Sequence, residues 1–223
     1  MIIAIDGPAA AGKGTLAKKL AETLQCAYLD TGALYRAVGL TMIRKNMDPD
    51  DTEKAAVTAA NMTVSDFAAI IKDPDLRKEI GAKAAAKVAK NLEVRKALLK
   101  FQRDFAENPT FADGNKAKGS ILDGRDIGTV VCPNADIKFF VTASPEKRAE
   151  RRYKEYKEKN AAITFEEVLK DVKERDEADR TRSASPLVPA DDAIVLDTSS
   201  LTIDEVYEKA LTIIAKNGKG NAD

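Results

Sequence analysis

A glycine-rich segment near the N-terminus has the residue types and spacing of a phosphate-binding loop. It runs Gly7-Pro8-Ala9-Ala10-Ala11-Gly12-Lys13-Gly14-Thr15. Glycines let the backbone curl so that successive N–H groups point at one anion, and the N-terminus of a following helix adds partial positive charge. The pattern predicts a cradle for nucleotide phosphates, with Lys13 on the β- and γ-phosphates. Because Gly14 follows the lysine, the hydroxyl of Thr15 comes one residue late, and we expect it to reach a metal through water.

Two further clusters combine aspartate with arginine. In Asp30-Thr31-Gly32-Ala33-Leu34-Tyr35-Arg36, Thr31 is expected to cap a helix, and that helix N-terminus together with Arg36 would form a second anion site. In Asp123-Gly124-Arg125-Asp126-Ile127-Gly128, the first carboxylate can hold water on Mg²⁺. Arg125 can donate two hydrogen bonds to phosphate, and Asp126 can accept from an amino group. An ion pair in a turn and a simple helix cap are the structural alternatives.

Arginines also gather between residues 148 and 182. Arg148, Arg151 and Arg152 are spaced to share one helix face, and so are Arg175, Asp179 and Arg182. Solvated salt bridges would explain such helices, but the planar guanidinium favours phosphate recognition. We interpret the region as a helical hairpin that closes over a transferred group and excludes water.

The elements that must position these residues are short apolar strands separated by helices. Strands are predicted at 2–5, 120–123, 137–141 and 193–196, with a shorter one at 27–29. This alternation predicts an α/β fold with a central parallel five-stranded sheet flanked by helices. Ligands of such sheets lie beyond the carboxyl ends of the strands, where Asp6, Asp30, Asp123 and Asp197 stand. Asp197 is interpreted as a turn or capping residue. Residues 50–107 predict two or three helices inserted into this fold.

Composition excludes several function classes. The chain has 223 residues, 36 Lys+Arg against 36 Asp+Glu, and no histidine. Balanced charge argues against nucleic-acid or anionic-membrane partners, and the lack of histidine excludes Ser-His-Asp catalysis. Two isolated cysteines, Cys26 and Cys132, fit a reducing cytoplasm. No signal peptide or membrane span is expected, and without a coiled-coil pattern a monomer is expected.

Four motifs together resemble the bacterial cytidylate kinase family. They are the loop with Gly12-Lys13-Gly14-Thr15, Leu-Asp-Thr-Gly-Ala-Leu-Tyr-Arg at 29–36, Asp-Gly-Arg-Asp-Ile-Gly-Thr-Val-Val at 123–131, and Lys-Glu-Arg-Asp…Asp-Arg-Thr-Arg…Pro-Leu-Val-Pro at 173–189. The resemblance covers nearly the whole chain. It implies phosphoryl transfer from ATP to CMP or dCMP with Mg²⁺. It also implies a core (1–36, 107–145 and 183–223), a helical monophosphate-binding insertion (37–106) and a helical-hairpin lid (146–182).

The resemblance also implies roles for single residues. ATP would be bound by residues 7–15 with Arg148, Arg151 and Arg152, and catalysis would depend on Lys13, Arg125, Asp126 and Arg182. The CMP phosphate would be surrounded by Thr31, Arg36, Arg125 and Arg182, and its sugar by Arg175 and Asp179. Asp126 and Arg95 would read cytosine, whose N4 amino group is a hydrogen-bond donor. Thr15 and Asp123 would hold the metal through water.

Two departures from the family and several rival functions bear on specificity. A serine that helps to read cytosine in the family aligns with Ala86, and residues 62–80 are too short and too helix-prone for a small β-sheet that longer members carry. The rivals are a broader UMP/CMP or other small-substrate kinase, a nucleotide-dependent binding or switch protein, and an inactive structural homologue. No guanine-binding Asn/Thr-Lys-x-Asp motif is present, and the intact loop and arginine clusters disfavour the last reading.

Overall fold

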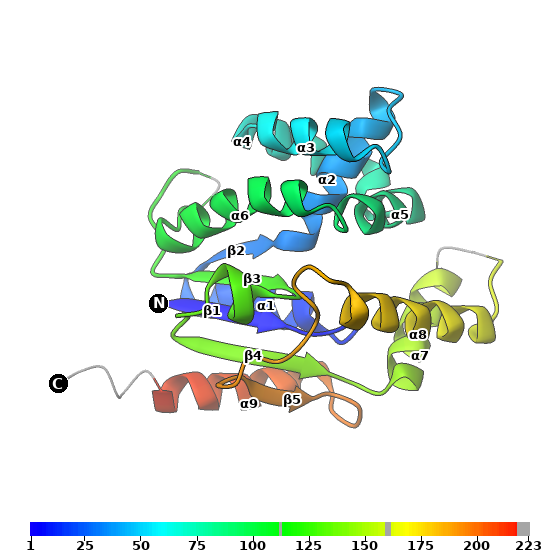
Figure 1. Cartoon of the computed structure of the whole chain (residues 1–223). Helices are drawn as coiled ribbons and strands as arrows, with labels where there is room; N and C mark the ends of the chain where they lie inside the picture. The colour runs from blue at the N-terminus through cyan, green and yellow to red at the C-terminus, as the bar shows by residue number, and fades with distance from the viewer. Residues whose placement is uncertain (112, 159–161, 218–223) are drawn as a thin grey trace. The chain divides into compact units, whose positions relative to one another are not determined.

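The computed structural model describes residues 1–111, 113–158 and 162–217 (Figure 1). The chain forms two compact units, one of Met1–Tyr28 with Ala106–Asp223 and one of Leu29–Phe105. The predicted lid and the last predicted core segment extend into 159–161 and 218–223, which lie outside the described residues. None of the helices in the described part of the chain is long and apolar enough to cross a membrane.

A five-stranded sheet organises the first unit. Its strands are β1 (Ile2–Asp6), β2 (Ala27–Asp30), β3 (Ser120–Gly124), β4 (Ile137–Thr142) and β5 (Ile194–Asp197), in the order β2-β3-β1-β4-β5. The strands β1, β3, β4 and β5 run parallel, and β1 lies between β3 and β4 (Figure 1). All five predicted strands are confirmed to within one residue at either end. Asp6 pairs in register with Gly124 and Phe140, so the carboxyl ends of the three central strands meet at one edge.

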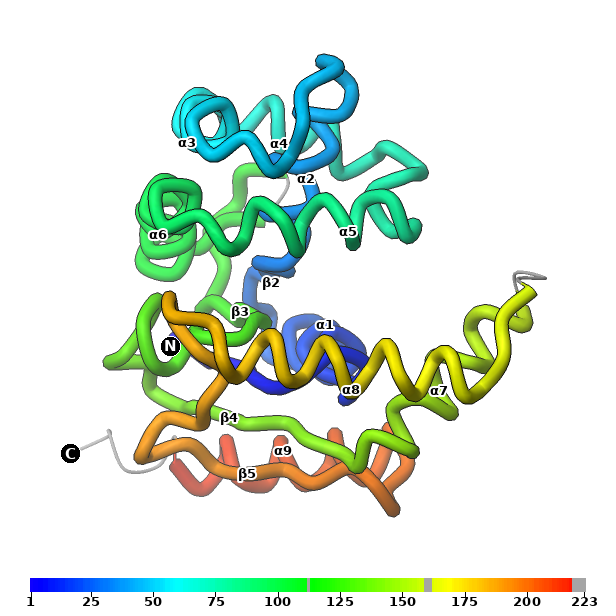
Figure 2. Tube along the Cα trace, turned by 45° about the vertical axis from the view of Figure 1, so that its right-hand side comes forward, coloured from blue at the N-terminus to red at the C-terminus, as the bar shows by residue number. Residues whose placement is uncertain are grey.

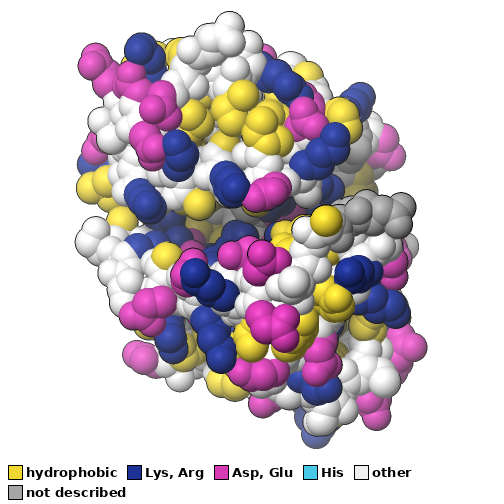
Figure 3. Space-filling model, turned by 90° about the vertical axis from the view of Figure 1, so that its right-hand side faces the viewer, with side chains coloured by type: hydrophobic (Ala, Val, Ile, Leu, Met, Phe, Trp, Pro, Cys, Tyr) yellow, Lys and Arg dark blue, Asp and Glu magenta, His cyan; other side chains and the backbone are white. Residues whose placement is uncertain are grey.

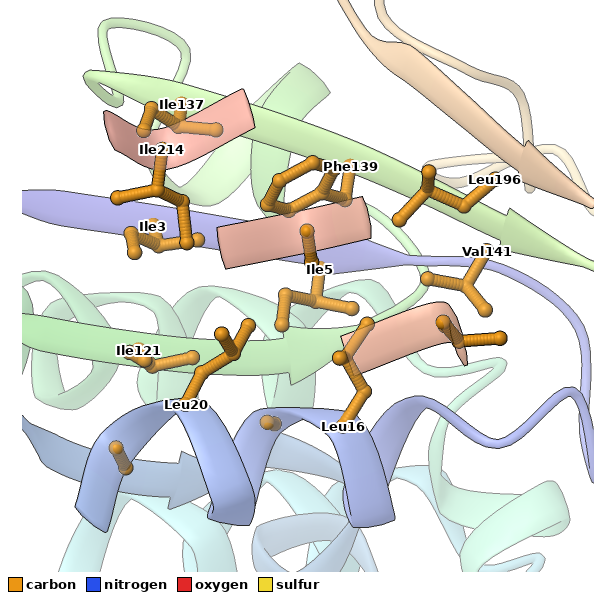
Figure 4. Close-up of a cluster of buried hydrophobic side chains, with 14 of the residues drawn as sticks. Ile3, Ile5, Leu16, Leu20, Ile121, Ile137, Phe139, Val141, Leu196 and Ile214 are labelled. Carbon is orange, nitrogen blue, oxygen red and sulfur yellow. The ribbon is translucent and has the colours of Figure 1, made fainter. Parts of the chain in front are cut away.

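Two helices cover one face of this sheet. Apolar residues of α1 (Lys13–Leu24) and α9 (Ile203–Asn217) pack on alternate residues of the strands, because side chains two apart in a strand share a face (Figure 4). Burial of one such side chain contributes roughly 1.5–3 kcal/mol. The cluster includes Ile3, Ile5, Leu16, Leu20, Ile121, Phe139, Val141 and Ile214. The sheet and the helix that begins at Lys13 therefore form one rigid core.

The predicted lid is a pair of helices, α7 (Pro145–Glu158) and α8 (Phe165–Thr181), which pack against each other (Figure 2). Ala149, Val168 and Val172 form a small apolar cluster between them. The ring of Tyr153 meets Phe165 edge-on at 6.0 Å between centroids. A hairpin with its own apolar seam can hold its arginines at fixed positions.

The second unit is helical. It contains α2 (Thr31–Arg44), α3 (Thr52–Asn61), α4 (Val64–Ile70), the 3₁₀ helix η1 (Pro74–Arg77), α5 (Glu79–Val88) and most of α6 (Leu92–Glu107). The prediction of two or three helices over 50–107 is wrong, because the described residues of this range form four α-helices. The short α4 was missed; Thr63 and Asp66 cap it reciprocally, which lets seven residues hold a helix. No strand forms among residues 62–80, all of which are described, as the sequence predicts.

Charge is distributed evenly on the surface that is drawn in Figure 3. Basic and acidic side chains are intermixed on this face, in agreement with 36 residues of each sign. Such a surface favours small charged ligands recognised locally over a large polyanion.

Candidate functional site

The glycine-rich loop leaves β1 at the central edge of the sheet. Gly7 has φ of 143°, and a Cβ there would lie 1.9 Å from the carbonyl oxygen of Val141, so only glycine fits. Gly12 caps α1 in the left-handed region with φ of 95° and has no side chain to offer the helix. The first turn, which starts with Lys13-Gly14-Thr15, contains no acidic residue. Its N–H groups and partial positive charge therefore suit an external anion.

Lys13 is buried at the start of α1. Its Nζ donates to the carbonyl oxygen of Pro8 at 2.8 Å, and only 6% of the residue is exposed. Burial lowers the pKa of Lys13 to about 7, with a further lowering by Arg125 and an opposite effect of Asp123 and Asp6. A bound polyphosphate would add negative charge beside the ammonium group and favour its charged form.

The structure explains why glycine follows the lysine. A Cβ at Gly14 would lie 3.2 Å from Oδ2 of Asp123 and 3.6 Å from the hydroxyl of Tyr28. That hydroxyl donates to the same carboxylate oxygen at 2.9 Å. Because Gly14 has no side chain, Tyr28 and Asp123 can approach the start of α1 closely. The sequence did not single out Tyr28, although it follows directly after Ala27 in a predicted strand.

The same region offers oxygen ligands for a cation. Thr15 is exposed in the first turn of α1, and Asp123 is buried at the end of β3. One hydroxyl and one carboxylate suit a hard divalent cation that keeps several waters and takes its other ligands from phosphates. No group of three or more His, Cys, Asp or Glu side chains that could hold a metal ion occurs in the described residues.

Arginines from distant segments meet around Asp179. Nε of Arg125 donates to Asp179 Oδ2 at 2.9 Å, and Nη1 of Arg182 lies 3.8 Å from Oδ1. Burial alone would raise the pKa of Asp179, but Arg125, Arg175 and Arg182 more than offset this and lower it. The structure thus brings together the loop after β3 and the end of α8, as a shared anion site requires.

Asp126 lies at the start of the short π-helix η2 (Ile127–Val131) and is 8% exposed. The N–H groups of Ile127 and Gly128 donate to the two carboxylate oxygens of Asp6 at 2.8 and 2.7 Å. Burial raises the pKa of Asp6 to about 6, although these two N–H donors lower it. The sequence places Asp6 at a strand end but does not assign it to the site.

The three arginines of α7 have different surroundings. Arg148 is only 2% exposed. Its Nη1 donates to Asp176 Oδ1 at 2.8 Å, and its Nη2 donates to Asp176 Oδ2. Its Nε donates to the carbonyl oxygen of Ala143 at 2.9 Å. Its Nη1 also reaches the carbonyl of Ala9 in the loop at 3.3 Å. Arg148 therefore ties the hairpin to the loop, a role that the shared helix face did not reveal.

The other two arginines of this face are less buried. Arg151 donates to the carbonyl oxygen and hydroxyl of Thr198 at 2.6 and 3.0 Å, and to the carbonyl of Ala11 at 3.4 Å. Arg152 stacks over the ring of Tyr156 at 5.2 Å. Asp197, next to Thr198, accepts from the backbone and hydroxyl of Ser199, which confirms it as a turn residue.

A second candidate anion site lies within the helical unit. The prediction that Thr31 caps α2 is wrong: Asp30 is the cap, accepts from the N–H of Ala33 at 3.0 Å, and leaves Thr31 as the first helical residue. Either residue type can cap a helix, and spacing does not tell them apart. Arg36 donates to Asp30 at 2.6 Å, while its buried Nε has no hydrogen-bond partner among the described residues. An unsatisfied buried donor is costly, and an anion would satisfy it.

Arg95 also lies in the helical unit, near the start of α6. It is 7% exposed, its guanidinium stacks over Tyr35 at 5.5 Å, and Nη1 donates to the carbonyl of Ala89 at 3.3 Å. Ala86 is exposed on the neighbouring helix α5. Arg36 belongs to α2 and Arg95 stacks on Tyr35 of the same helix, as a site on that helix requires.

The family follows from comparison with known proteins. A family model described as "Cytidylate kinase" matches residues 3–216, almost the whole chain. The chain belongs to the cytidylate kinase family. The cytidylate kinase of Paramagnetospirillum magneticum is 55% identical over 213 residues, which are 96% of this chain and 97% of that protein. That of Rhodospirillum rubrum is 50% identical over 215 residues, with 96% and 97% covered.

A solved structure supports the fold of this cytidylate kinase family member independently. An uncharacterised protein from Eubacterium ventriosum superimposes with a TM-score of 0.54 at 13% identity, and the match covers 96% of this chain and 98% of the other. At this identity the likeness concerns the fold alone. The assignment to the family therefore depends on the sequence matches, and the residue roles depend on the site.

We expect Lys13→Met to stabilise the protein while it abolishes activity. Between pH 7 and 10.5 the folded state binds fewer protons at Lys13 than the unfolded state, so stability rises with pH there and the penalty is largest at and below pH 7. Without nucleotide at pH 6.5, the free energy of unfolding of the variant should exceed that of the parent by roughly 2 kcal/mol. This figure already subtracts the stability lost with the hydrogen bond from Lys13 to Pro8. The gap should shrink by pH 9.5 in urea titrations.

Kinase turnover of the same Lys13→Met variant should fall by at least about a hundredfold, because charge on the transferring group is no longer stabilised. Lys18→Met, at an exposed position of the same helix, is the control and should change neither property. A Lys13→Met protein that is less stable than the parent at pH 6.5, or that retains turnover, would contradict the assignment.

The pair Arg148–Asp176 should be a structural contact. Arg148→Met leaves the partly buried carboxylate of Asp176 without its partner, so we expect a loss of about 3 kcal/mol in urea unfolding, and Arg148→Met/Asp176→Leu should recover at least about half. Arg180→Met removes an exposed pair with Glu177 on α8 and should cost under about 0.5 kcal/mol. A loss below about 1 kcal/mol for Arg148→Met would show that the contact is not structural.

Proposed function

We propose that this protein transfers the γ-phosphoryl group of ATP to CMP or dCMP and releases ADP with CDP or dCDP. Relatives named cytidylate kinase at 55% and 50% identity over nearly the full length support this activity. The observation that carries it is the meeting of Arg125, Asp179 and Arg182 in the same unit as Lys13 and its loop. A phosphate-binding loop and a separate arginine cluster are what two nucleotides require.

The loop of residues 7–15 would bind the ATP phosphates. Its N–H groups and Lys13 supply positive charge, and Arg151 and Arg152 extend that charge along α7. Arg148 was expected to contact ATP as well, but its guanidinium already contacts Asp176 and the loop backbone. We therefore assign Arg148 to holding the hairpin against the loop, and the ATP contacts to its two neighbours.

Mg²⁺ is the divalent ion that we propose for this reaction. Thr15 and Asp123 would hold it through water, and the hydroxyl of Tyr28 would keep the carboxylate of Asp123 oriented toward it. When bound, the ion shields the β- and γ-phosphate oxygens and aligns them. The small ligand set in the described residues agrees with an ion that arrives with ATP.

The residues that we assign to the CMP phosphate are Thr31, Arg36, Arg125 and Arg182. The unsatisfied Nε of Arg36 at the start of α2 supports an anion there. Arg175 and Asp179 would contact the sugar, since a carboxylate whose pKa is lowered can accept from hydroxyls.

Asp126 and Arg95 would read the base. A carboxylate accepts from the N4 amino group of cytosine, whereas uracil has a carbonyl oxygen at that position. Asp126 is buried at the edge of the sheet, where water competes little for its hydrogen bonds. Ala86 supplies no hydroxyl, so in this chain base selectivity depends on the carboxylate and the guanidinium.

The chemistry needs no general base. An oxygen of the CMP phosphate is already anionic and attacks in line, while Lys13 and the arginines of the 125–182 cluster stabilise the charge that spreads over the transferred group. The hairpin of α7 and α8 would exclude water, which limits hydrolysis of ATP. Histidine is absent from the sequence, which agrees with a mechanism of positioning and charge.

The setting that we propose is a monomer in the cytoplasm that acts on free nucleotides. Both cysteines are buried and reduced, and the two signs of charge are equal in number. These features suit a reducing compartment and small-molecule substrates. A switch protein or a general small-substrate kinase would not need the cytosine-reading pair of Asp126 and Arg95.

Arg36→Lys should raise KM for CMP by about 30-fold and leave KM for ATP within about threefold, because lysine cannot reproduce the fork that binds Asp30 and phosphate together. Arg44→Lys is the matched control at the other end of the same helix, where the arginine pairs with Asp73 and Asp75. Steady-state kinetics with each substrate varied measure both values. An unchanged KM for CMP in Arg36→Lys would exclude Arg36 from the phosphate site.

A coupled assay with CMP, dCMP, UMP and AMP tests the base-reading role. The parent should prefer CMP over UMP by at least about tenfold in kcat/KM, and Asp126→Asn should lower that ratio by about 10- to 100-fold, because an amide can donate to the carbonyl of uracil. The outcome that contradicts the proposal is UMP used as well as CMP by the parent enzyme. ATP turnover without any monophosphate would favour a switch protein.

A further inference from the structure

The helix that follows Asp126 is capped by a residue distant in sequence. Asp6 is the last residue of β1 and is 5% exposed. Its Oδ1 accepts from the N–H of Ile127 at 2.8 Å, and its Oδ2 accepts from the N–H of Gly128 at 2.7 Å. The carboxylate therefore satisfies the first two N–H groups of η2, which no residue within that helix can satisfy.

This arrangement replaces the usual local cap. Asp126 occupies the capping position, with φ of −146° and ψ of 26°, yet among the described residues its side chain makes no capping hydrogen bond. An aspartate there ordinarily accepts from the N–H groups of the first turn. Asp6 accepts from these N–H groups instead and so holds the backbone that directly follows Asp126. Its backbone is still held, because its carbonyl accepts from Val130 and Val131 at 2.9 and 3.1 Å.

The fit around η2 is tight. A Cβ at Gly128 would lie 3.4 Å from Oδ2 of Asp6 and 3.1 Å from Cδ of Lys138. Lys138 is fixed in turn, as its Nζ donates to the carbonyl of Pro133 and to Asp192 at 2.5 and 2.8 Å. The start of the helix is thus held between β1 and β4 and has little room to shift.

We propose that Asp6 is a positioning residue for base recognition, which caps residues 127–131 and so holds the backbone of Asp126 where its carboxylate can accept from the N4 amino group of cytosine. The proposal rests on the proposed role of Asp126 as the residue that reads the base. Asp6 itself touches neither nucleotide in this scheme. It couples the strand that carries the phosphate loop to the segment that selects the monophosphate.

The test is Asp6→Asn, measured beside Asp126→Asn and Asp136→Asn. Asparagine keeps the size of the side chain, but its amino group would face a backbone N–H, so one of the two capping bonds is lost. Asp136 is the matched control, because its Oδ2 accepts from the N–H of Ile2 at 2.6 Å at the other end of the same strand.

Two readouts are expected to change in Asp6→Asn. The ratio of kcat/KM for CMP over UMP should fall by at least about tenfold, mainly through KM for CMP, as expected when a base-reading carboxylate is displaced. Amide hydrogen exchange in a peptide that covers 125–131 should accelerate by about tenfold or more. Asp136→Asn should leave the ratio and this exchange as in the parent.

The outcomes separate the two proposals. An Asp6→Asn enzyme that loses activity equally with CMP and UMP, or keeps the parent ratio while Asp126→Asn loses it, would overturn the positioning role and leave the proposed function intact. A parent ratio in Asp126→Asn would instead overturn the base-reading role, and the role of Asp6 with it. If Asp6→Asn does not fold, Gly128→Ala is the second variant. Its added Cβ would press on Lys138 and on Asp6 Oδ2, so it displaces the same turn and should also lower the ratio.

Discussion

Parallel strands bring their carboxyl ends to one edge, and the charges that gather there must neutralise one another. Asp6 ends β1, and Asp123 lies next to the end of the neighbouring strand β3. Lys13 starts α1, the helix that follows the loop after β1. All three residues are buried. Isolated buried charges are costly, so these groups are stable only as a set. Burial still lowers the pKa of Lys13 and raises that of Asp6, so the three groups offset one another's burial only in part. The proposed nucleotide phosphates would add negative charge beside Lys13 and favour its charged form.

The arginines show how one residue type is divided between structure and ligand binding. Arg148 and Arg151 both lie on α7 and both reach carbonyl oxygens of the loop. Arg148 is fully enclosed by Asp176 and backbone acceptors, whereas Arg151 is only partly buried. On α8 and beyond β3, Asp179 instead gathers Arg125 and Arg182 around itself. Acidic partners thus keep a dense group of like charges together in the absence of substrate.

Glycines in this protein mark close approaches between segments that are distant in sequence. Gly7 lies against the backbone of Val141, and Gly14 leaves space for the pair of Tyr28 and Asp123. At Gly7 a Cβ would meet the backbone of Val141, and at Gly14 it would press on the side chain of Asp123. Glycine at these two positions therefore lets the loop lie close to its neighbours.

The sequence alone determined the five strands, the helix after the loop and the clusters of residues with chemistry, because short apolar runs and glycine-rich turns are local signals. It did not determine which of two adjacent residues, Asp30 or Thr31, caps α2, nor the short helix α4. Only the tertiary structure decided that Arg148 is buried against Asp176 and that Asp6 caps the helix after Asp126. These contacts join residues 28 and 121 positions apart, and burial and pairing at that separation arise only when the strands and helices pack.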